Sequence, residues 1–497
     1  MKLNTILESV KQFPANPSFD PEIKGLACDS RQVRQGYVFF ALPGQRQDGR
    51  MFIQDAIDRG AEVIVTGQEG GQHRGGGLAG RGHALLLHSA DPRQAMAQFA
   101  CAFYRKPSSR LVTVGITGTN GKTTTAFMVK NILDEVGLPA GMIGTVEYII
   151  GRRVIPAART TPESIDLQQM LDQMTGAGCK SAVMEVSSHA LVQKRVWGID
   201  FDAAVFTNLT HDHLDYHQNL EKYFQAKSVL FREIGHGAKK PAAVLNLDDP
   251  FGQRLAAMPE IKANIITYGI NEKAAVRAGG LRLEAQGSRF SVASPWGAMD
   301  ISLRLLGRYN VSNALAAIGA CGALGIKPEL MARVLQQMGC VPGRLEEIRN
   351  QAGFQIFVDY AHTEDALRNV LGTLREITSG RLIVVFGCGG NRDRKKRPLM
   401  GSVAEQMADY TVLTSDNPRQ EEPDSIINQI VAGIKDRSKA EIIPDRYEAI
   451  ARALSLAEKG DVVLVAGKGH ENYQEFANTI IPFDDRQVVR DCLGIKS

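Results

Sequence analysis

The chain has 497 residues, of which 44% are apolar and 23% are charged, and its formal net charge is +4. This length predicts about three globular domains of roughly 150 residues each. No apolar run approaches the ~20 residues that cross a bilayer, and no basic stripe accompanies the small net charge. We therefore expect neither membrane insertion nor a nucleic-acid partner.

The cysteines and the first residues favour a cytoplasmic protein. The seven cysteines are scattered and lack CxxC spacing, which argues against a disulfide framework or a zinc knuckle. The first residues, MKLNTILESVKQF, have the pattern of an amphipathic helix. They lack the apolar core and the cleavage site of a secretory signal.

The first predicted domain, residues 1–107, is a small α/β domain. Its apolar runs GYVFFALPG, AEVIVTG and HALLLHS are typical of short strands between helices. The stretch 67–83 is rich in glycine and low in complexity, and no strand and helix bracket it as they would a phosphate loop. We interpret this stretch as a surface insertion and assign it no function.

The second predicted domain, residues 108–340, alternates strand-like runs such as RLVTVGIT and DAAVFTNL with helical patterns such as NLEKYFQAKSVLFREI. This order predicts a mostly parallel sheet with flanking helices. Residues 280–305 predict antiparallel hairpins appended to that sheet, and NVSNALAAIGACGALG predicts the helix that closes the domain.

The third predicted domain, residues 341–497, repeats this alternation. Its strands FQIFVDYA, RLIVVFGCG, YTVLTSD and DVVLVAGKG each end in a loop that holds Gly, Asp, Asn or His. Ligands bind beyond the carboxyl ends of the strands in such open sheets. The predicted fold class is therefore α/β with three domains: a small N-terminal domain, a central phosphate-loop domain and a Rossmann-like C-terminal domain.

The stretch GITGTNGKTTT, residues 115–125, is interpreted as a phosphate loop, because it lies between an apolar strand and a helix. Glycines let backbone amides approach an anion, Lys122 can neutralise phosphate charge, and the Thr123 hydroxyl can bind Mg²⁺. Ile116 replaces the first glycine of the usual pattern, so the loop reads G-x-x-G-x-x-G-K-T. A chance glycine turn before a helix is the alternative.

Two polar clusters follow later strands. In MEVSSHALVQKR, residues 184–195, Glu185 could bind a second Mg²⁺; a helix start capped by Ser187 or Ser188 is the alternative, and it does not exclude that role. TNLTHDHLDYHQN, residues 207–219, holds three histidines and two aspartates without a nearby cysteine. This composition favours His213 as a nitrogen ligand in an oxygen-rich Mg²⁺ site over zinc. Independent surface histidines are the alternative.

Two further stretches leave a choice open. In YFQAKSVLF the amphipathic pattern predicts that Lys227 is a solvated lysine on the polar face of a helix. In LTSDNPRQEEP, residues 413–423, Asp416, Asn417 and Pro418 are typical of a turn. The guanidinium of Arg419 beside that turn could also receive a ligand carboxylate.

Nine motifs together resemble the Mur ligase family, and they cover all three predicted domains in order. Single motifs are shared with relatives such as folylpolyglutamate synthase, but the complete run is specific. The motifs are the phosphate loop, EVSSHALVQKR, TNLTHDHLDYH, YFQAK, GRYNVSNALAA, DYAHTEDAL, GCGGNRDRKKRPLM, DNPR and GKGHE.

The resemblance implies an ATP-dependent carbon–nitrogen ligase of cytoplasmic peptidoglycan precursor synthesis, expected to be a monomer. ATP would phosphorylate the free D-glutamyl carboxylate of UDP-N-acetylmuramoyl-L-alanyl-D-glutamate, and an amine of meso-diaminopimelate would attack the acyl phosphate. A lysine-adding ligase is the rival within the family, and Arg419 argues against it because lysine has no second carboxylate. Outside the enzymes, the phosphate loop could serve a nucleotide-dependent switch.

The resemblance also implies the residues of each site. ATP would contact Gly118, Thr119, Asn120, Gly121, Lys122, Thr123, Thr124, Asn310, Arg344 and His362. Catalysis would use Lys122, Glu185, His213 and Lys227. Mg²⁺ would be bound by Thr123, Glu185, His213 and a CO₂-derived carbamate on Lys227. The carbamate is an anion and can bind the metal, whereas a lysine ammonium would repel it.

For the other two substrates, the sugar dipeptide would contact Cys28, Ser30, Gln45, Arg46, Gln47, Arg159, Thr160, Thr161, Ser187, Gln193 and Arg195. Diaminopimelate would contact Arg392, Asp416, Asn417, Pro418, Arg419, Gly467 and Glu471. The sequence departs from the family pattern at Arg159, Glu364 and Asn391, which affects peripheral substrate contacts only.

Overall fold

The computed structural model describes residues 1–10, 12–13, 19–44, 47–67, 77–79, 84–284 and 286–495. The chain divides into two compact units. The first consists of Met1–Gly115, Leu138–Asp202 and Arg232–Pro241, and the second of Ile116–Gly137, Ala203–Phe231 and Ala242–Ser497. Among the helices of the described ranges, none has the length and apolar character needed to cross a bilayer.

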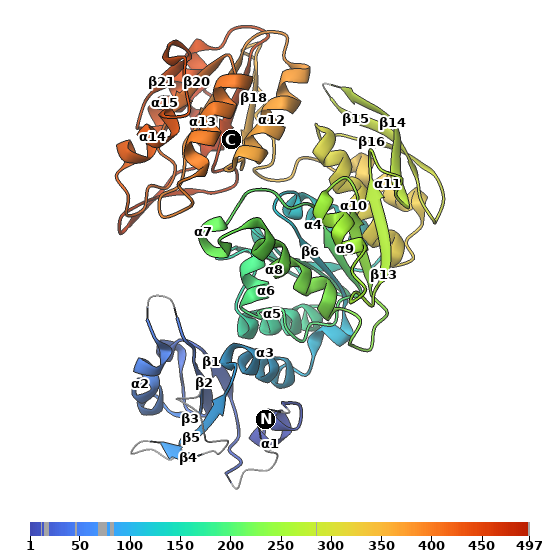
Figure 1. Ribbon diagram of the computed structural model, residues 1–497, viewed down its shortest axis with the longest axis vertical. Coiled ribbons are helices and arrows are strands. Elements are labelled where there is room, and N and C mark those ends of the chain that lie inside the picture. Colours follow the sequence, from blue (N-terminus) through green and yellow to red (C-terminus); the bar gives the residue numbers. More distant parts are fainter. Residues whose placement is uncertain are drawn as a thin grey trace. The chain divides into compact units, whose positions relative to one another are not determined.

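The first unit begins with a five-stranded sheet that has helices on both faces (Figure 1). Because strand side chains alternate between faces, Val38 and Phe40 pack with α1 and α3, whereas Phe39 and Ala41 pack with α2. The strand order is β1 (Gly25–Ala27), β2 (Tyr37–Ala41), β3 (Ala61–Gly67), β5 (Ala84–Ser89) and β4 (Gly77–Ala79), and the helices are α1 (Leu3–Leu7), α2 (Ile53–Asp58) and α3 (Pro92–Phe103).

The three strands predicted for residues 1–107 are confirmed, but the predicted N-terminal helix is much shorter than its apolar pattern. It ends at Leu7, where the Leu3, Ile6 and Leu7 side chains are already buried. Of the glycine-rich stretch 67–83, only its first residue and residues 77–79, which form β4, lie within the described ranges.

The rest of the first unit is a second strand and helix layer. Its strands β10, β7, β8 and β9 are neighbours in that order, with β10 and β7 parallel and the others antiparallel. The elements are β7 (Ala140–Ile143), β8 (Glu147–Ile150), β9 (Arg153–Pro156), α5 (Ser164–Gly176), β10 (Ser181–Glu185) and α6 (Ser188–Val192); β6 (Val112–Thr117) continues into the second unit.

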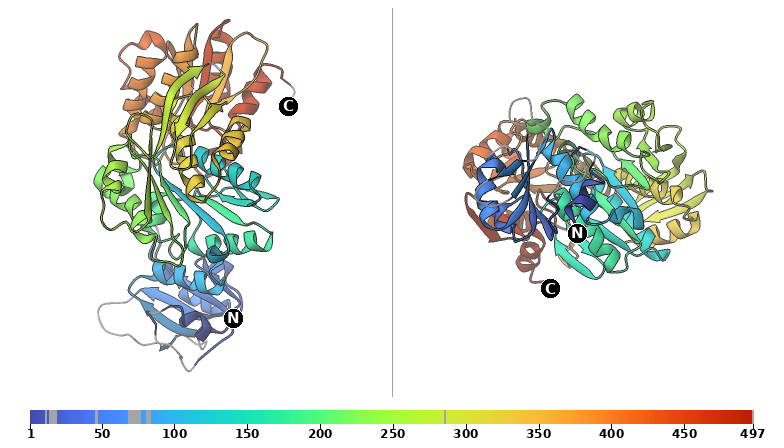
Figure 2. Two further views of the ribbon diagram at one scale, coloured as in Figure 1. Left: turned by 90° about the vertical axis from the view of Figure 1, so that its right-hand side faces the viewer. Right: turned by 90° about the horizontal axis from the view of Figure 1, so that it is seen from below.

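The second unit starts with the helix α4 and a run of neighbouring strands from β11 to β16. The pairs from β11 to β14 are parallel, and β14, β15 and β16 form the predicted antiparallel hairpins (Figure 2). The elements are α4 (Lys122–Glu135), β11 (Ala203–Phe206), α7 (Leu214–His217), α8 (Leu220–Glu233), β12 (Ala242–Asn246), α9 (Pro250–Ala256), β13 (Asn264–Gly269), β14 (Val276–Glu284), β15 (Gly287–Ala293) and β16 (Met299–Leu303).

Two helices, α10 (Arg308–Ala323) and α11 (Pro328–Gln337), then lead to a six-stranded sheet. The sequence predicted α10 as the last helix and missed α11. The sheet order is β17 (Glu346–Glu347), β18 (Gln355–Asp359), β22 (Val462–Ala466), β19 (Leu382–Phe386), β20 (Tyr410–Leu413) and β21 (Ala440–Ile442), and only β17 is antiparallel to its neighbour.

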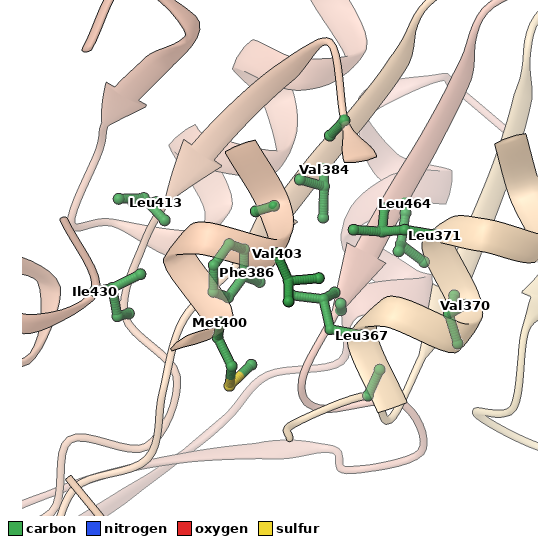
Figure 3. Close-up of a cluster of buried hydrophobic side chains, with 14 of the residues drawn as sticks. Leu367, Val370, Leu371, Val384, Phe386, Met400, Val403, Leu413, Ile430 and Leu464 are labelled. Atoms are coloured by element: carbon green, nitrogen blue, oxygen red, sulfur yellow. The ribbon is translucent and has the colours of Figure 1, made fainter. Parts of the chain in front are cut away.

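Helices cover both faces of this sheet, as the Rossmann-like prediction requires. On one face Phe386 and Leu464 pack against Leu367 and Leu371 of α12 and Val403 of α13 (Figure 3). On the other face α15 and α16 form a second core. The helices are α12 (Glu364–Ile377), α13 (Lys396–Met407), α14 (Pro423–Val431), α15 (Arg446–Leu456) and α16 (Asp485–Cys492), and a hairpin of β23 (Tyr473–Phe476) and β24 (Thr479–Pro482) precedes α16.

A fully buried ion pair fixes the carboxyl ends of two of these strands. Arg446 donates from Nε and Nη2 to the two carboxylate oxygens of Asp485, at 2.8 and 2.7 Å. The same guanidinium donates to the Ala466 carbonyl at the end of β22 (3.0 Å) and to the Ser415 carbonyl just after β20 (3.4 Å). The pair therefore holds together the two loops in which the sequence predicts an amino-acid site.

Replacing Asp485 with asparagine is expected to lower the free energy of unfolding by ~3–5 kcal/mol, because it leaves a buried arginine without its counter-ion. Urea denaturation measures the change. Asp491→Asn is the control, since the Asp491 carboxylate lies on the same helix but is exposed and bonds only a glutamine amide. Equal midpoints for the two variants would contradict the stabilising role of the ion pair.

Candidate active site

The phosphate loop is formed by tightly packed backbone between β6 and α4. A Cβ added at Gly118 would lie 1.8 Å from Thr207 Oγ1, and one added at Gly121 would lie 2.3 Å from Asn313 Oδ1, so neither position tolerates a side chain. Lys122 donates from Nζ to the carbonyls of Gly118 (3.0 Å) and Thr119 (2.8 Å). A cationic amine over a glycine-rich turn at a helix N-terminus fits a bound phosphate chain.

Groups from later segments of the second unit reach this loop. Arg344 donates from Nη2 to Thr123 Oγ1 at 3.0 Å, which places a guanidinium beside the hydroxyl predicted to bind Mg²⁺. Asp365 accepts from Asn120 Nδ2 at 2.7 Å and was missed by the sequence reasoning. Asn310 is linked to the loop through Asn313. Its Oδ1 accepts a hydrogen bond from Asn313 Nδ2, and the Asn313 side chain packs on Gly121.

His362 is a neutral, partly buried imidazole in the same unit. Its Nδ1 donates to the Tyr360 carbonyl at 2.9 Å, and Lys396 Nζ donates to the His362 carbonyl at 2.8 Å. Burial, reinforced by the Lys396 charge, lowers the pKa of His362 to about 4. With Nδ1 donating and no charge at neutral pH, Nε2 is available as a hydrogen-bond acceptor.

Lys227 is not solvated, so the expectation from its helical pattern is wrong. Its side chain is buried with 1% exposed area, because Tyr223, Phe224 and Phe231 turn this face of α8 into the core. Nζ donates to the Gly118 carbonyl at 2.7 Å and lies 4.6 Å from the centre of the Tyr223 ring. Burial, with the Lys122 charge nearby, lowers the pKa of Lys227 well below its ordinary value.

The three histidines of residues 207–219 have three different environments, and only His217 is buried. His217 is buried and stacks on Tyr223 at 4.9 Å, and His211 Nε2 lies 3.2 Å from Asp393 Oδ2. His213 is the N-cap residue before α7, in the left-handed conformation (φ 54°), and 41% of its side chain is exposed. Nowhere in the described ranges do three His, Cys, Asp or Glu side chains group as a metal site by themselves.

In the first unit, Glu185 ends β10 with its carboxylate held by the loop that follows β7. Thr145 donates to it from the backbone nitrogen (2.8 Å) and from Oγ1 (2.9 Å). A Cβ at Gly144 would come within 2.6 Å of Glu185 Oε1, so the close approach depends on glycine. Thr160 Oγ1 lies 3.1 Å from Thr145 Oγ1, which adds one predicted sugar-dipeptide residue to this group.

Four other residues predicted to bind the sugar dipeptide are joined directly. Arg195 donates to the Thr161 carbonyl (2.8 Å) and to Gln193 Oε1 (2.7 Å), and the Thr161 hydroxyl accepts from the backbone nitrogen of Ser187 (3.1 Å). Ser187 also caps α6, since its Oγ accepts from the Ala190 nitrogen. The capping role and a binding role are therefore compatible.

The predicted uridine pocket is described only in part, because Gln45 and Arg46 lie outside the described residues. Ser30 is buried, whereas Gln47 is exposed. Burial, together with the nearby Glu163 carboxylate, raises the pKa of the Cys28 thiol to about 11, so this cysteine stays protonated at neutral pH.

The loops after β20 and β22 form one charged cluster around Asn417. Its Oδ1 accepts from Lys468 Nζ (3.1 Å) and from the Glu475 nitrogen (3.0 Å), and its Nδ2 donates to Glu471 Oε2 (2.9 Å). Burial, with the Asp416 charge, raises the pKa of Glu471, and the buried Lys468 opposes that rise. Glu475 was missed because nothing in the sequence places the β23 hairpin against this turn, and Lys468 was passed over although it lies between the predicted residues Gly467 and Glu471.

Arg419 lies at the edge of this cluster in the left-handed conformation, with φ 53°. It donates from Nε to Glu475 Oε2 (2.8 Å) and from Nη1 to the Gly390 carbonyl (2.9 Å), and 19% of its side chain is exposed. Nη2 has no hydrogen-bond partner among the described residues. The predicted turn is confirmed, and it follows the end of β20. It places the partly exposed guanidinium of Arg419 beside Asn417 and Glu471.

Two other residues predicted for this site also lie at the cluster. A Cβ at Gly467 would come within 2.7 Å of Asp416 Oδ2, so glycine is required there. Arg392 donates to the Asn391 carbonyl at 3.3 Å, and Asn391 occupies the left-handed conformation with φ 53°.

These features define an α/β protein with a phosphate loop and separate clusters of polar and charged side chains. Three family models match the chain: "Mur ligase family, catalytic domain" over residues 22–104, "Mur ligase middle domain" over 116–321, and "Mur ligase, glutamate ligase domain" over 343–469.

Two relatives are named UDP-N-acetylmuramoyl-L-alanyl-D-glutamate–2,6-diaminopimelate ligase. The one from Geobacillus kaustophilus is 46% identical over 99% of both chains, and the one from Geobacter metallireducens is 43% identical over 98% of both. A solved structure of a ligase with this name is 34% identical, covers 95% of each chain and has a TM-score of 0.65. The chain therefore belongs to the Mur ligase family, which makes it an enzyme of the ligase class with the three-domain α/β architecture of that family.

Proposed function

We propose that this enzyme is an ATP-dependent amide ligase that adds meso-diaminopimelate to UDP-N-acetylmuramoyl-L-alanyl-D-glutamate. The observation that carries the proposal is the charged cluster around Asn417. Diaminopimelate has a second ammonium and a second carboxylate, and Glu471 with Arg419 complements that pair. The names of relatives that match nearly the whole chain point to the same substrates.

The reaction solves the problem that a carboxylate does not accept an amine directly. The D-glutamyl carboxylate attacks the γ-phosphorus of ATP and ADP leaves, which produces an acyl phosphate. The amine then attacks the acyl carbon, loses a proton, and the tetrahedral intermediate expels phosphate. No protein nucleophile is needed, so the tasks of the chain are positioning and charge stabilisation. Lys122 and Arg344 at the phosphate loop supply positive charge for this purpose.

We further propose that Thr123, Glu185, His213 and a carbamate on Lys227 hold Mg²⁺, which would neutralise phosphate charge when bound. The Thr123 hydroxyl at the start of α4 and the Glu185 carboxylate suit a hard cation that prefers oxygen ligands. The carbamate would form when the Lys227 nitrogen attacks CO₂ and releases a proton. That attack requires the uncharged amine, which burial favours because it lowers the pKa of Lys227.

The predicted domain boundaries, 1–107, 108–340 and 341–497, remain part of this proposal. The three matched family models fall inside them, with gaps at 105–115 and 322–342. A cytoplasmic location and a monomeric state are also proposed; ATP and UDP-linked substrates are consistent with the former.

A phosphate-release assay separates this ligase from a nucleotide-dependent switch. The purified protein is given ATP and Mg²⁺ with both the UDP-sugar dipeptide and diaminopimelate, and then with each acceptor omitted in turn. The acyl phosphate forms only on the dipeptide. We therefore expect rapid phosphate release when the dipeptide and diaminopimelate are both present, and at least tenfold slower release when either one is omitted. Turnover that is equally fast without acceptors would favour the switch.

A further inference from the structure

Glu163 occupies the N-cap position of α5 without capping it. Its backbone is extended (φ −64°, ψ 157°), and its carbonyl accepts the first helical bond from the Leu167 nitrogen at 2.9 Å. The side chain makes no capping hydrogen bond. Ser, Thr, Asp and Asn are preferred at this position because their short side chains bond the exposed amides of the first turn. A glutamate that does not cap therefore needs another explanation.

The Glu163 carboxylate is directed into a group of arginines. Oε1 accepts from Arg159 Nη1 at 2.6 Å and lies 2.8 Å from Arg195 Nη2. Oε2 is buried, has no hydrogen-bond partner in the part of the chain that the structure describes, and lies 3.9 Å from Arg93 Nη1. The exposed side-chain fractions are only 16% for Glu163 and 10% for Arg195, so solvent screens this pair less than a surface pair.

The arginine at the centre of this group is one that the proposed function uses. Arg195 is held by two neutral acceptors, the Thr161 carbonyl and Gln193 Oε1, and by one anion, Glu163. The Asp166 carboxylate is also close enough to interact with Glu163 and Arg159, so three guanidinium groups face two carboxylates and positive charge remains in excess at this place. That excess fits an anionic substrate. Arg159, a departure from the family pattern, pairs with Glu163 from the non-helical segment that precedes α5.

We propose that Glu163 is a positioning residue for the sugar dipeptide, which orients Arg195 and Arg159 toward an anionic group of that substrate. This inference rests on the proposed function. An arginine that is already held in place loses less side-chain entropy when the substrate binds. Glu163 itself need not touch the substrate, since it acts through the arginines.

The test uses Glu163→Ser, which removes the carboxylate but supplies a hydroxyl that can cap α5. We expect kcat/KM for the UDP-sugar dipeptide to fall at least tenfold, the KM values for ATP and diaminopimelate to stay within twofold, and Tm to be unchanged or higher. Glu163→Gln, which keeps the size and an acceptor oxygen, is the second variant and should show a smaller fall. Asp172→Asn is the control, because Asp172 on the same helix pairs with Arg110 in an exposed salt bridge.

The double variant Glu163→Ser/Arg195→Ala distinguishes positioning from general stabilisation. If Glu163 acts through Arg195, the serine substitution should add less than a threefold further loss once Arg195 is absent. The inference is overturned by a sugar-dipeptide kcat/KM within twofold of wild type, by equal losses for all three substrates, or by fully additive losses. Failure of the proposed function would look different, since the wild-type enzyme would then not ligate diaminopimelate at all.

Discussion

Replacing Lys227 with alanine is expected to slow ligation by about a thousandfold, or ~4 kcal/mol of transition-state stabilisation, and acetate is expected to restore part of the rate. The wild-type nitrogen is buried against the Gly118 carbonyl of the phosphate loop. A carbamate there would be an anion beside the phosphates and Mg²⁺. Alanine removes it and leaves space in which a small carboxylate can take its place.

The measurement is the initial rate of ligation in increasing acetate or formate, with chloride at the same ionic strength as the reference. Lys222→Ala is the matched control, because Lys222 lies on the same helix but is exposed and bonds only the Gln218 amide. It should keep the wild-type rate and show no response to acetate. A Lys227→Ala enzyme that no carboxylate rescues would contradict the carbamate, although it would leave open a role for the amine itself.

Replacing Arg419 with alanine is expected to lower kcat/KM for diaminopimelate by ~2–5 kcal/mol of transition-state stabilisation, because a partly desolvated charge pair is lost. The KM for ATP should stay within twofold. The geometry refines the bidentate contact expected from the sequence: Nε already donates to Glu475 and Nη1 to Gly390. The substrate carboxylate is therefore expected to bind chiefly through Nη2.

Steady-state kinetics with diaminopimelate as the varied substrate check this expectation. Arg452→Ala is the matched control, since Arg452 also donates from Nε to a glutamate, Glu441, at 3.0 Å, but 45% of its side chain is exposed and no role in substrate binding is proposed for it. An unchanged kcat/KM for diaminopimelate in Arg419→Ala would refute the assignment of this arginine.

Local patterns were sufficient for the strands and for the phosphate loop. Alternating or continuous apolar runs bounded by Gly, Asp and Asn identified β2, β6, β11, β19 and β22. Gly118 and Gly121 have positive φ (151° and 86°), which is a local reason for glycine in this motif, and both also make room for residues that are distant in sequence, Thr207 and Asn313. Short elements without strong periodicity, such as β7 to β9, α11 and the β23 hairpin, were not predicted.

The site residues that were missed depend on long-range packing. The helical pattern of α8 predicted a solvated Lys227, and only tertiary packing buries it. Glu475 meets Arg419 because a hairpin that begins some fifty residues later pairs with the turn, through Arg419 N and the Glu475 carbonyl at 3.0 Å. Asp365 and Glu163 resemble ordinary first-turn helix acids, and their partners Asn120 and Arg195 are visible only in three dimensions.

The central claim is that this ligase selects diaminopimelate, and parallel ligation reactions with diaminopimelate and with lysine test it most directly. The purified enzyme, ATP, Mg²⁺ and UDP-N-acetylmuramoyl-L-alanyl-D-glutamate are common to both, and the products are measured by mass spectrometry together with released phosphate. We expect one phosphate per tripeptide formed with diaminopimelate, and a kcat/KM for lysine lower by about a hundredfold or more, because lysine leaves Arg419 without a partner carboxylate. Equal or faster ligation of lysine would contradict the account.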